Sequence, residues 1–317
     1  MRILFIGTGG IGVPVLQSLF DSAEHQVIGV VTQPDKPAGR RQELQPSPIK
    51  QAALLHGVPV LQPVRMRSPE AVASIQSLSP EVIVVMAYGQ ILPKEVLDAP
   101  SIACLNLHAS LLPKYRGAAP IQAAMEVGDA ETGITVMYMD VGLDTGDILL
   151  EKRLPIRRRE TGGTLHDRLA AISPAALAAA LPLLAQGTAP RIPQDSALAT
   201  YAPKLTRESG VIDWSAPHLQ IDRKIRAMNP WPAACTTLPG KDGHPQKLKI
   251  FTVIPHRKCS GAPGEVLHTG KNGILVAAGT GGILLREVQL EGKKRMPARD
   301  FLSGNMIPPG TILGAAL

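Results

Sequence analysis

Short apolar runs alternate with helix-like segments through the first half of the chain. The clearest run is Val82–Met86, and similar strand-like runs lie at 3–6, 27–32, 58–61, 104–107 and 134–139. Helical spacing of apolar residues falls between them, at 14–22 and 70–78. Runs that are apolar on both faces and separated by helices predict a parallel α/β sheet with helices on both sides, a Rossmann-like arrangement. Such sheets bind ligands at the carboxyl ends of their strands, so the chemistry is expected there.

The pattern changes near residue 187. The stretch before it, 169–187, is uncharged and rich in Ala, and its two prolines favour a packed helix or helix pair over a membrane span. After a Pro-containing segment come a short helix at 218–228 and strand-like runs at 248–253, 264–268, 273–277 and 282–290. This spacing predicts a small, OB-like β-barrel. The expected organisation is a catalytic domain at 1–188, a linker at 189–207 and a barrel domain at 208–317.

Charge separates the same two parts. The chain carries 33 Lys and Arg against 26 Asp and Glu, a net charge of +7, and all of the excess lies beyond residue 204. That asymmetry favours a polyanionic partner for the C-terminal part, and the alternative is a basic surface that only keeps the protein soluble. The three cysteines are far apart and the histidines form no ligand pair, so neither a disulfide scaffold nor a metal site is expected. The first apolar run ends at Gly7, too early for a signal peptide, and we expect a cytoplasmic protein without membrane attachment.

A glycine-rich turn follows the first strand. Gly7 to Gly12 satisfies the GxGxxG pattern of dinucleotide-binding folds, and Asp35 lies near the expected position of a ribose-binding acid. An NAD-dependent oxidoreductase is therefore one interpretation. Against it, Asp35 falls in a Pro-interrupted loop rather than at a strand end, and a tight strand-to-helix turn needs glycines for its own geometry.

The densest polar cluster lies further along. Asn106 and His108 are two apart at the end of a predicted strand, so their side chains share one face. A second cluster, Asp140–Asp147, follows the 134–139 strand and contains Asp144. An amide that can hold an oxyanion, an imidazole and a carboxylate suit direct transfer of an acyl or formyl group to an amine. The competing interpretation is that Asn106 and His108 are polar residues capping a loop.

These residues carry a resemblance to a known family. Asn106-Leu107-His108, Ser110-Leu111-Leu112-Pro113 and Arg116–Gln122 resemble the signature of enzymes that take a formyl group from 10-formyltetrahydrofolate. The segments Thr32–Arg40 and Ile225–Pro232 resemble the branch of that family that formylates the methionine carried by initiator tRNA. The glycine turn departs from the family, which usually has Gly-Thr-Pro there.

The resemblance implies a role for each matching residue. Asn106 would hold the formyl oxygen, His108 would stabilise the developing charge, and Asp144 would orient His108 and help relay a proton. The folate co-substrate would contact the segment Ser110, Leu111, Leu112 and Pro113, and the backbone of Tyr88, Gly89 and Leu92.

The resemblance also implies a tRNA-binding surface. The loop between Asp35 and Lys50 would enter the acceptor arm, with Arg40 and Arg41 as contacts, while the barrel would follow the tRNA backbone. Lys293, Lys294 and Arg295 form a basic cluster in the barrel and are expected to contact phosphates. We expect a monomer with no metal. A non-catalytic tRNA-binding protein and a formyltransferase acting on a small amine stay open as alternatives, although the C-terminal charge and the Arg40–Arg41 pair argue against the latter.

Overall fold

A computed structural model of the chain describes residues 1–38, 42–240 and 244–314. It folds into two compact units. The first comprises Met1–Pro120, Glu131–Pro155 and His166–Pro203. The second comprises Ile121–Ala130, Ile156–Leu165 and Lys204–Leu317. Residues 189–203 of the expected linker therefore belong to the first unit.

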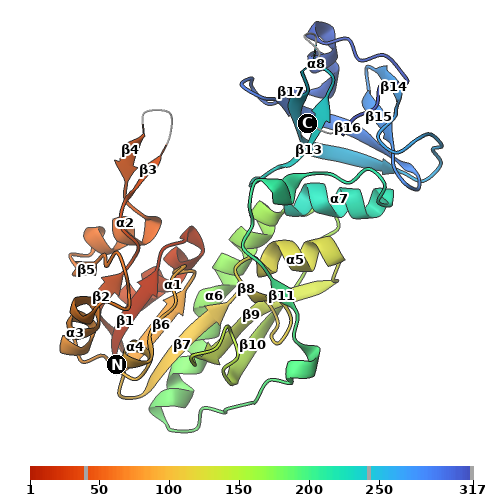
Figure 1. Ribbon diagram of the computed structural model, residues 1–317. Coiled ribbons are helices and arrows are strands. Elements are labelled where there is room, and N and C mark those ends of the chain that lie inside the picture. Colours follow the sequence, from red (N-terminus) through yellow and green to blue (C-terminus); the bar gives the residue numbers. More distant parts are fainter. Residues whose placement is uncertain (39–41, 241–243, 315–317) are drawn as a thin grey trace. The chain divides into compact units, whose positions relative to one another are not determined.

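The first unit is built on a sheet with strand order β10-β9-β7-β6-β1-β2-β5 (Figure 1). Its strands are β1 (Arg2–Gly7), β2 (Gln26–Val31), β5 (Val60–Leu61), β6 (Val82–Met86), β7 (Ala103–His108), β9 (Glu131–Tyr138) and β10 (Ile148–Pro155). The strands from β7 to β5 run parallel to their neighbours. Every residue of β6 is buried, as its unbroken apolar run predicts for a central parallel strand.

The direction of two strands in this sheet differs from the sequence prediction. The run at 134–139 forms β9, but β9 lies antiparallel to β7, and β10 is antiparallel to β9. The sheet is therefore mixed, with a parallel core and an antiparallel edge. Because a strand buried on both faces shows the same apolar run in either direction, the pattern that located β9 could not reveal its orientation.

Short strand pairs and helices complete the chain up to residue 210, and those within Ile121–Ala130, Ile156–Leu165 and after Lys204 belong to the second unit. β3 (Lys36–Ala38) pairs with β4 (Glu43–Gln45) in a hairpin, and β8 (Arg116–Gly117) pairs in parallel with β11 (Tyr201–Ala202). The α-helices up to residue 185 are α1 (Val13–Phe20), α2 (Pro48–Leu55), α3 (Pro69–Ser77), α4 (Lys94–Leu97), α5 (Pro120–Val127) and α6 (Gly162–Ala185). The 3-10 helices are η1 (Gly10–Gly12), η2 (Ser196–Leu198) and η3 (Glu208–Gly210).

α6 is one continuous helix with both prolines inside it, rather than a helix pair. It is long and apolar enough to cross a membrane by length and composition alone. Leu165, Leu169, Leu177 and Leu181 are buried along it, however, and Ser173 donates its hydroxyl hydrogen to the carbonyl oxygen of Leu169. α6 is therefore a core helix of the fold.

The second unit contains an antiparallel sheet with strand order β12-β13-β16-β15-β14, and β17 pairs with β16. Its elements are α7 (His218–Ala227), β12 (Ala234–Leu238), β13 (Gln246–His256), β14 (Val266–Gly270), β15 (Gly273–Ala277), β16 (Gly282–Leu290), β17 (Met296–Pro297) and α8 (Ala298–Gly304). Trp214 and Phe301 pack into one apolar core with the inward residues of these strands. The predicted C-terminal β domain is confirmed as an antiparallel β domain. Within the residues described, β12 and β14 are the two ends of its strand order.

Candidate active site

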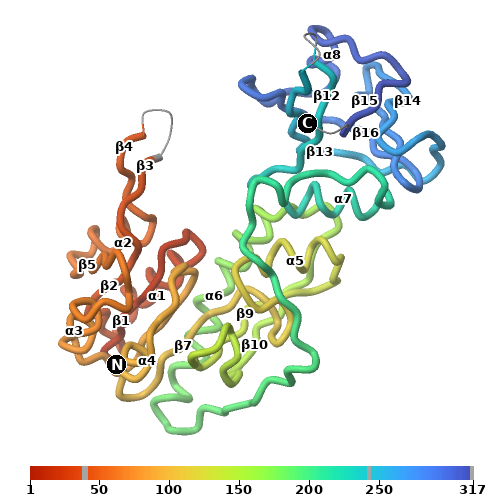
Figure 2. Tube along the Cα trace, in the orientation of Figure 1, coloured from red at the N-terminus to blue at the C-terminus, as the bar shows by residue number. Residues whose placement is uncertain are grey.

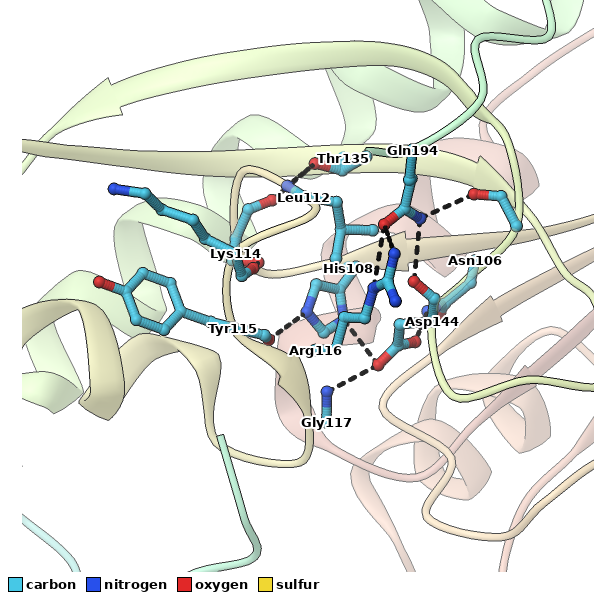
Figure 3. A network of polar contacts seen from close by, with 12 residues as sticks. Asn106, His108, Leu112, Lys114, Tyr115, Arg116, Gly117, Thr135, Asp144 and Gln194 are labelled. Atoms are coloured by element: carbon cyan, nitrogen blue, oxygen red, sulfur yellow. Dashed lines mark hydrogen bonds and ion pairs between the residues drawn. The ribbon is translucent and has the colours of Figure 1, made fainter. Parts of the chain in front are cut away.

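Asn106 and His108 project from β7 onto the same face of the sheet (Figure 3). β7 lies between β6 and β9, and Asn106 and His108 stand opposite Met137 and Thr135 of β9. His108 is buried and Asn106 is partly exposed. The alternation of the strand therefore places both polar groups together, as their spacing predicts.

The His108 ring is held from both nitrogens. Nε2 lies 2.9 Å from the carbonyl oxygen of Tyr115, and Nδ1 lies 3.6 Å from Oδ2 of Asp144. A carbonyl oxygen only accepts hydrogen bonds, so Nε2 carries a hydrogen in this geometry. Nδ1, which faces the carboxylate, is consequently the nitrogen that can gain or release a proton.

Asp144 joins this pair from the loop that follows β9. Its backbone is in the left-handed region, at φ 52°, which is rare for a residue other than glycine. Oδ2 accepts a hydrogen bond from the backbone N–H of Gly117 at 2.8 Å, and Oδ1 accepts one from Nδ2 of Asn106 at 3.4 Å. The loop is tied internally, because Asp140 accepts hydrogen bonds from Gly142 N and the Thr145 hydroxyl. The three residues thus form one connected group of amide, imidazole and carboxylate.

The segment from Ser110 to Pro113 follows β7 and is fastened to the sheet by Thr135. The Thr135 hydroxyl donates to the carbonyl oxygen of Ser110 at 2.6 Å and accepts from the N–H of Leu112 at 3.1 Å. Ser110 in turn donates its hydroxyl hydrogen to the carbonyl oxygen of Lys114 at 2.7 Å. Leu111 and Pro113 are partly exposed. Thr135 is fully buried and gives this segment a fixed backbone.

Tyr88 and Leu92 place their side chains in the core rather than in solvent. The Tyr88 hydroxyl is buried without a hydrogen-bond partner among the described residues, and burial raises its pKa to about 12. The carbonyl oxygen of Tyr88 accepts from Gln33 Nε2 at 2.7 Å and from the Thr8 hydroxyl at 3.1 Å. Gly89 has φ 82°, and a Cβ there would lie 2.7 Å from the same Gln33 nitrogen. Any ligand contact made by these residues would therefore come from backbone atoms.

The glycine turn has packing reasons for its composition. A Cβ on Gly7 would lie 2.8 Å from the carbonyl oxygen of Met86, and one on Gly12 would lie 3.1 Å from the Phe5 ring. Asp35 is bound by Lys50 Nζ at 2.7 Å and by Gln62 Nε2 at 2.8 Å. These hydrogen bonds lower the pKa of Asp35, and the one from Lys50 has the larger effect. The acid that would bind a ribose is thus already engaged by protein side chains.

Two residues that bind Asp144 were not predicted from the sequence. Gly117 supplies the N–H that binds Asp144, and Gln194, from the expected linker, donates to the carbonyl oxygens of Asp144 and Gly146. Gln194 also accepts hydrogen bonds from the buried side chain of Arg116. Arg116 and Gly117 stand in the recognised motif but had no role assigned to them. Gln194 has no local signal, since it lies in a Pro-containing stretch with no periodicity.

The basic residues expected to bind tRNA differ in their surroundings. Arg40 and Arg41 lie outside the described residues. Lys293 and Lys294 are exposed on the turn after β16. Arg295 is already engaged, because its Nη2 lies 2.6 Å from Glu287 and its guanidinium stacks over the Phe251 ring.

The site offers neither an activated thiol nor a group of metal ligands in the residues described. Burial raises the pKa of Cys104, on β7, to about 12, which keeps the thiol protonated at neutral pH. No set of three or more His, Cys, Asp or Glu side chains gathers in the described part of the chain. The grouping of amide, imidazole and carboxylate suits direct transfer of an acyl or formyl group to an amine.

Comparisons with known proteins decide the family. Residues 1–181 match the model of the formyl transferase family, and residues 204–306 match that of its C-terminal domain. A methionyl-tRNA formyltransferase from Methylacidiphilum infernorum is 51% identical over 315 residues, which is 99% of this chain and 98% of that protein. One from Geobacter sulfurreducens is 47% identical over 316 residues, covering 100% of this chain and 98% of its own. The chain belongs to the methionyl-tRNA formyltransferase family.

Solved structures agree with that assignment at the level of the fold. A methionyl-tRNA formyltransferase from Clostridium thermocellum superimposes with a TM-score of 0.56 at 19% identity, over 80% of this chain and 93% of that one. The sugar 3N-formyltransferase WlaRD gives 0.65 at 17% identity, over 93% and 99% of the two chains. Methionyl-tRNA formyltransferases depend on formyltetrahydrofolate, which confirms the expected co-substrate. The NAD interpretation of the glycine turn is thereby set aside.

Proposed function

We propose that this chain transfers the formyl group of 10-formyltetrahydrofolate to the free amino group of methionyl initiator tRNA. The observation that carries the proposal is that Asn106, His108 and Asp144 lie together in one site. They do so in a chain that is about half identical to methionyl-tRNA formyltransferases over nearly its whole length. Tetrahydrofolate and N-formylmethionyl-tRNA, which serves translation initiation, are the products.

The reaction needs one bond made and one broken. The amine nitrogen of the methionyl group attacks the formyl carbon, and the carbonyl oxygen gains negative charge in the tetrahedral intermediate. The bond between that carbon and N10 of the folate then breaks. The attacking nitrogen loses one proton and N10 gains one, so no net proton is exchanged with solvent.

Each catalytic residue is assigned by what its atoms can offer. The Asn106 amide has two N–H donors, and one directed at Asp144 leaves the other for the formyl oxygen. His108 stabilises the charge that develops on that oxygen. Asp144, 3.6 Å from Nδ1, orients the His108 ring and helps move the proton from the amine to N10.

The folate is assigned to the rim beside this group. The segment Ser110 to Pro113, fixed by Thr135, presents Leu111 and Pro113 as partly exposed apolar surface. Tyr88, Gly89 and Leu92 are assigned to the pterin through their backbone, since the Tyr88 and Leu92 side chains are buried. A folate carries both a flat apolar ring and amide-like edges, so apolar and backbone contacts suit it together.

The tRNA is assigned to the basic parts of the chain. In the sequence, Arg40 and Arg41 fall between β3 and β4, and we assign them to the acceptor arm. Lys293 and Lys294, exposed after β16, are assigned to phosphate groups. Arg295 contributes less, because Glu287 already neutralises it. We place the enzyme in the cytoplasm as a monomer.

The decisive experiment offers the purified chain 10-formyltetrahydrofolate with charged initiator tRNA, and in parallel with a nucleotide-linked amino sugar. Formation of formylmethionine on the tRNA is the expected result. Formylation of the sugar alone would overturn the tRNA assignment in favour of a small-amine enzyme. Enhanced NADH fluorescence on mixing would instead revive the oxidoreductase interpretation, and tRNA binding without formyl transfer would indicate a non-catalytic protein.

A further inference from the structure

The segment from residue 189 to residue 203, here called the connector, runs along the first unit from the end of α6 to β11 (Figure 2). Ile192 exchanges two backbone hydrogen bonds with Ile148, at 2.8 and 3.0 Å. Arg191 stacks over the Tyr138 ring, and its Nη1 lies 3.8 Å from Asp147. The connector is thus fastened beside the loop that carries Asp144.

One connector side chain reaches into the catalytic group itself. Gln194 donates from Nε2 to the carbonyl oxygen of Asp144 at 2.9 Å and to that of Gly146 at 2.7 Å (Figure 3). These bonds hold the backbone of the loop at the residue whose φ is positive. A non-glycine residue in that conformation persists only where its surroundings impose it.

The oxygen of the same amide binds the segment that contains Arg116 and Gly117. Gln194 Oε1 accepts from Arg116 Nε at 3.1 Å and from Arg116 Nη2 at 2.7 Å. Arg116 is only 3% exposed, and the next residue, Gly117, donates its N–H to the Asp144 carboxylate. Gln194 therefore links the two segments that fix Asp144, one at its backbone and one at its side chain.

The chemistry of glutamine matches this position closely. A primary amide offers two N–H donors for the two carbonyl oxygens and one acceptor oxygen for the guanidinium. Glutamate would keep the Arg116 partner but would place an oxygen against two carbonyl oxygens. Alanine would remove both halves of the link and leave the buried guanidinium without this acceptor.

We propose that Gln194 is a positioning residue for catalysis, which keeps the Asp144 carboxylate in register with His108 by bridging Arg116 to the Asp144–Gly146 backbone. The proposal rests on the formyl-transfer function proposed above. It assigns to the connector a part of the active site, not only the joining of two units.

The test compares Gln194→Ala and Gln194→Glu with a matched control, Gln186→Ala, an exposed glutamine at the end of α6. We expect both Gln194 variants to lose about 10- to 100-fold in kcat, with the KM for each substrate within about twofold of the parent. The Glu variant still offers a side-chain oxygen to Arg116, so it reports on the loop even if the Ala variant folds poorly. The control should match the parent. Parent-like kcat in the Glu variant would overturn the proposal.

A double-mutant cycle separates positioning from general structural damage. In an Asp144→Asn background, Gln194→Glu should lower kcat by less than about twofold, because the group it positions is already altered. A full loss repeated in that background would overturn the proposal. Failure of the parent itself to formylate tRNA would concern the proposed function instead. In that case a crystal structure of Gln194→Glu decides, since an unchanged 2.8 Å contact between Gly117 N and Asp144 Oδ2 would overturn the positioning role.

Discussion

Gly117 donates its backbone N–H to the carboxylate of Asp144, 27 residues further along the chain, at 2.8 Å. The oxygen that accepts this bond is the one facing His108 Nδ1. A backbone donor cannot rotate away as a side chain can, so the carboxylate is oriented by the β8–β11 pairing that contains Gly117. The position of the Asp144 carboxylate is therefore sensitive to the backbone of a two-residue strand.

Replacing Gly117 by Ala should lower both activity and stability. Its φ is 113°, and a Cβ would lie 2.7 Å from the carbonyl oxygen of Ala202, so the β8–β11 pairing must shift. We expect at least a tenfold loss of kcat and a lower melting temperature. Gly187→Ala is the control, because Gly187 also has positive φ but a Cβ there meets nothing within 4 Å. The control should lose only about 1–2 kcal/mol of stability and no activity.

Removing the proposed catalytic side chains should slow formyl transfer strongly without unfolding the chain. Asn106→Ala removes a donor to the developing oxyanion, and we expect kcat to fall by about 10²–10³. For His108→Ala the expected loss is about 10²–10⁴. His166→Ala serves as control, since this partly exposed histidine also lies beside a carboxylate, Asp167. Single-turnover formyl transfer measures all three, and parent-like rates in the Asn106 and His108 variants would contradict the mechanism.

The exposed lysines after β16 should act through tRNA phosphates. Replacing Lys293 and Lys294 together by Ala should weaken tRNA binding and reduce the slope of log K against log salt by about one unit for each phosphate left without its lysine. Binding titrations between low and moderate salt measure that slope. Lys94→Ala, an exposed lysine already paired with Asp98, should leave the slope unchanged. An unaltered slope in the double variant would remove these lysines from the interface.

Arg295, by contrast, should contribute to stability in a pH-dependent way. Its hydrogen bond holds the pKa of Glu287 below the usual value of 4.5, against the opposing effect of burial. Because the pKa is lower in the folded chain, the pair stabilises the fold above that usual value and loses this contribution as pH falls through the lowered one. Arg295→Met should therefore be less stable than the parent at pH 7. Urea unfolding measures the difference in free energy of unfolding between the parent and the variant, and this difference should be smaller in acid than at pH 7. An equal difference at both pH values would mean that only the Phe251 contact contributes.

The buried hydroxyl of Tyr88 should be dispensable. In the part of the chain that the structure describes it has no hydrogen-bond partner, so Tyr88→Phe removes an unsatisfied polar group and should raise the free energy of unfolding by about 1 kcal/mol. Because the folate is expected to meet only the backbone here, its KM should not change. A raised KM would show that the hydroxyl takes part in folate binding.

Much of the first unit was predictable because its signals are local. The apolar run at Val82–Met86 is a strand with the same bounds, and the spacing of Asn106 and His108 placed both on one face. The direction of β9 could not be predicted, since burial on both faces hides orientation. Prolines at 174 and 182 left a helix pair possible, whereas tertiary packing keeps α6 continuous.

The site was predictable only as far as its motif extends. The family resemblance brought Asp144 to His108, but residues that support the pair come from far along the chain. Gln194 lies 50 residues beyond Asp144, and Thr200 binds the Tyr115 N–H from 85 residues away. Contacts of that kind arise from the path of the connector, and nothing in the local composition marks them.

Because β8 pairs with β11, which comes much later in the chain, the site is completed in a fixed order during synthesis. A nascent chain that has reached the end of α6 already contains Asn106, His108 and Asp144, but Gln194 and the partner strand of Gly117 have not yet been made. Domains generally fold as units during synthesis, the N-terminal one first, so the first unit needs the connector before it is complete. The surroundings of the Asp144 carboxylate are consequently completed only when the connector has emerged, after Asn106, His108 and Asp144 have left the exit tunnel.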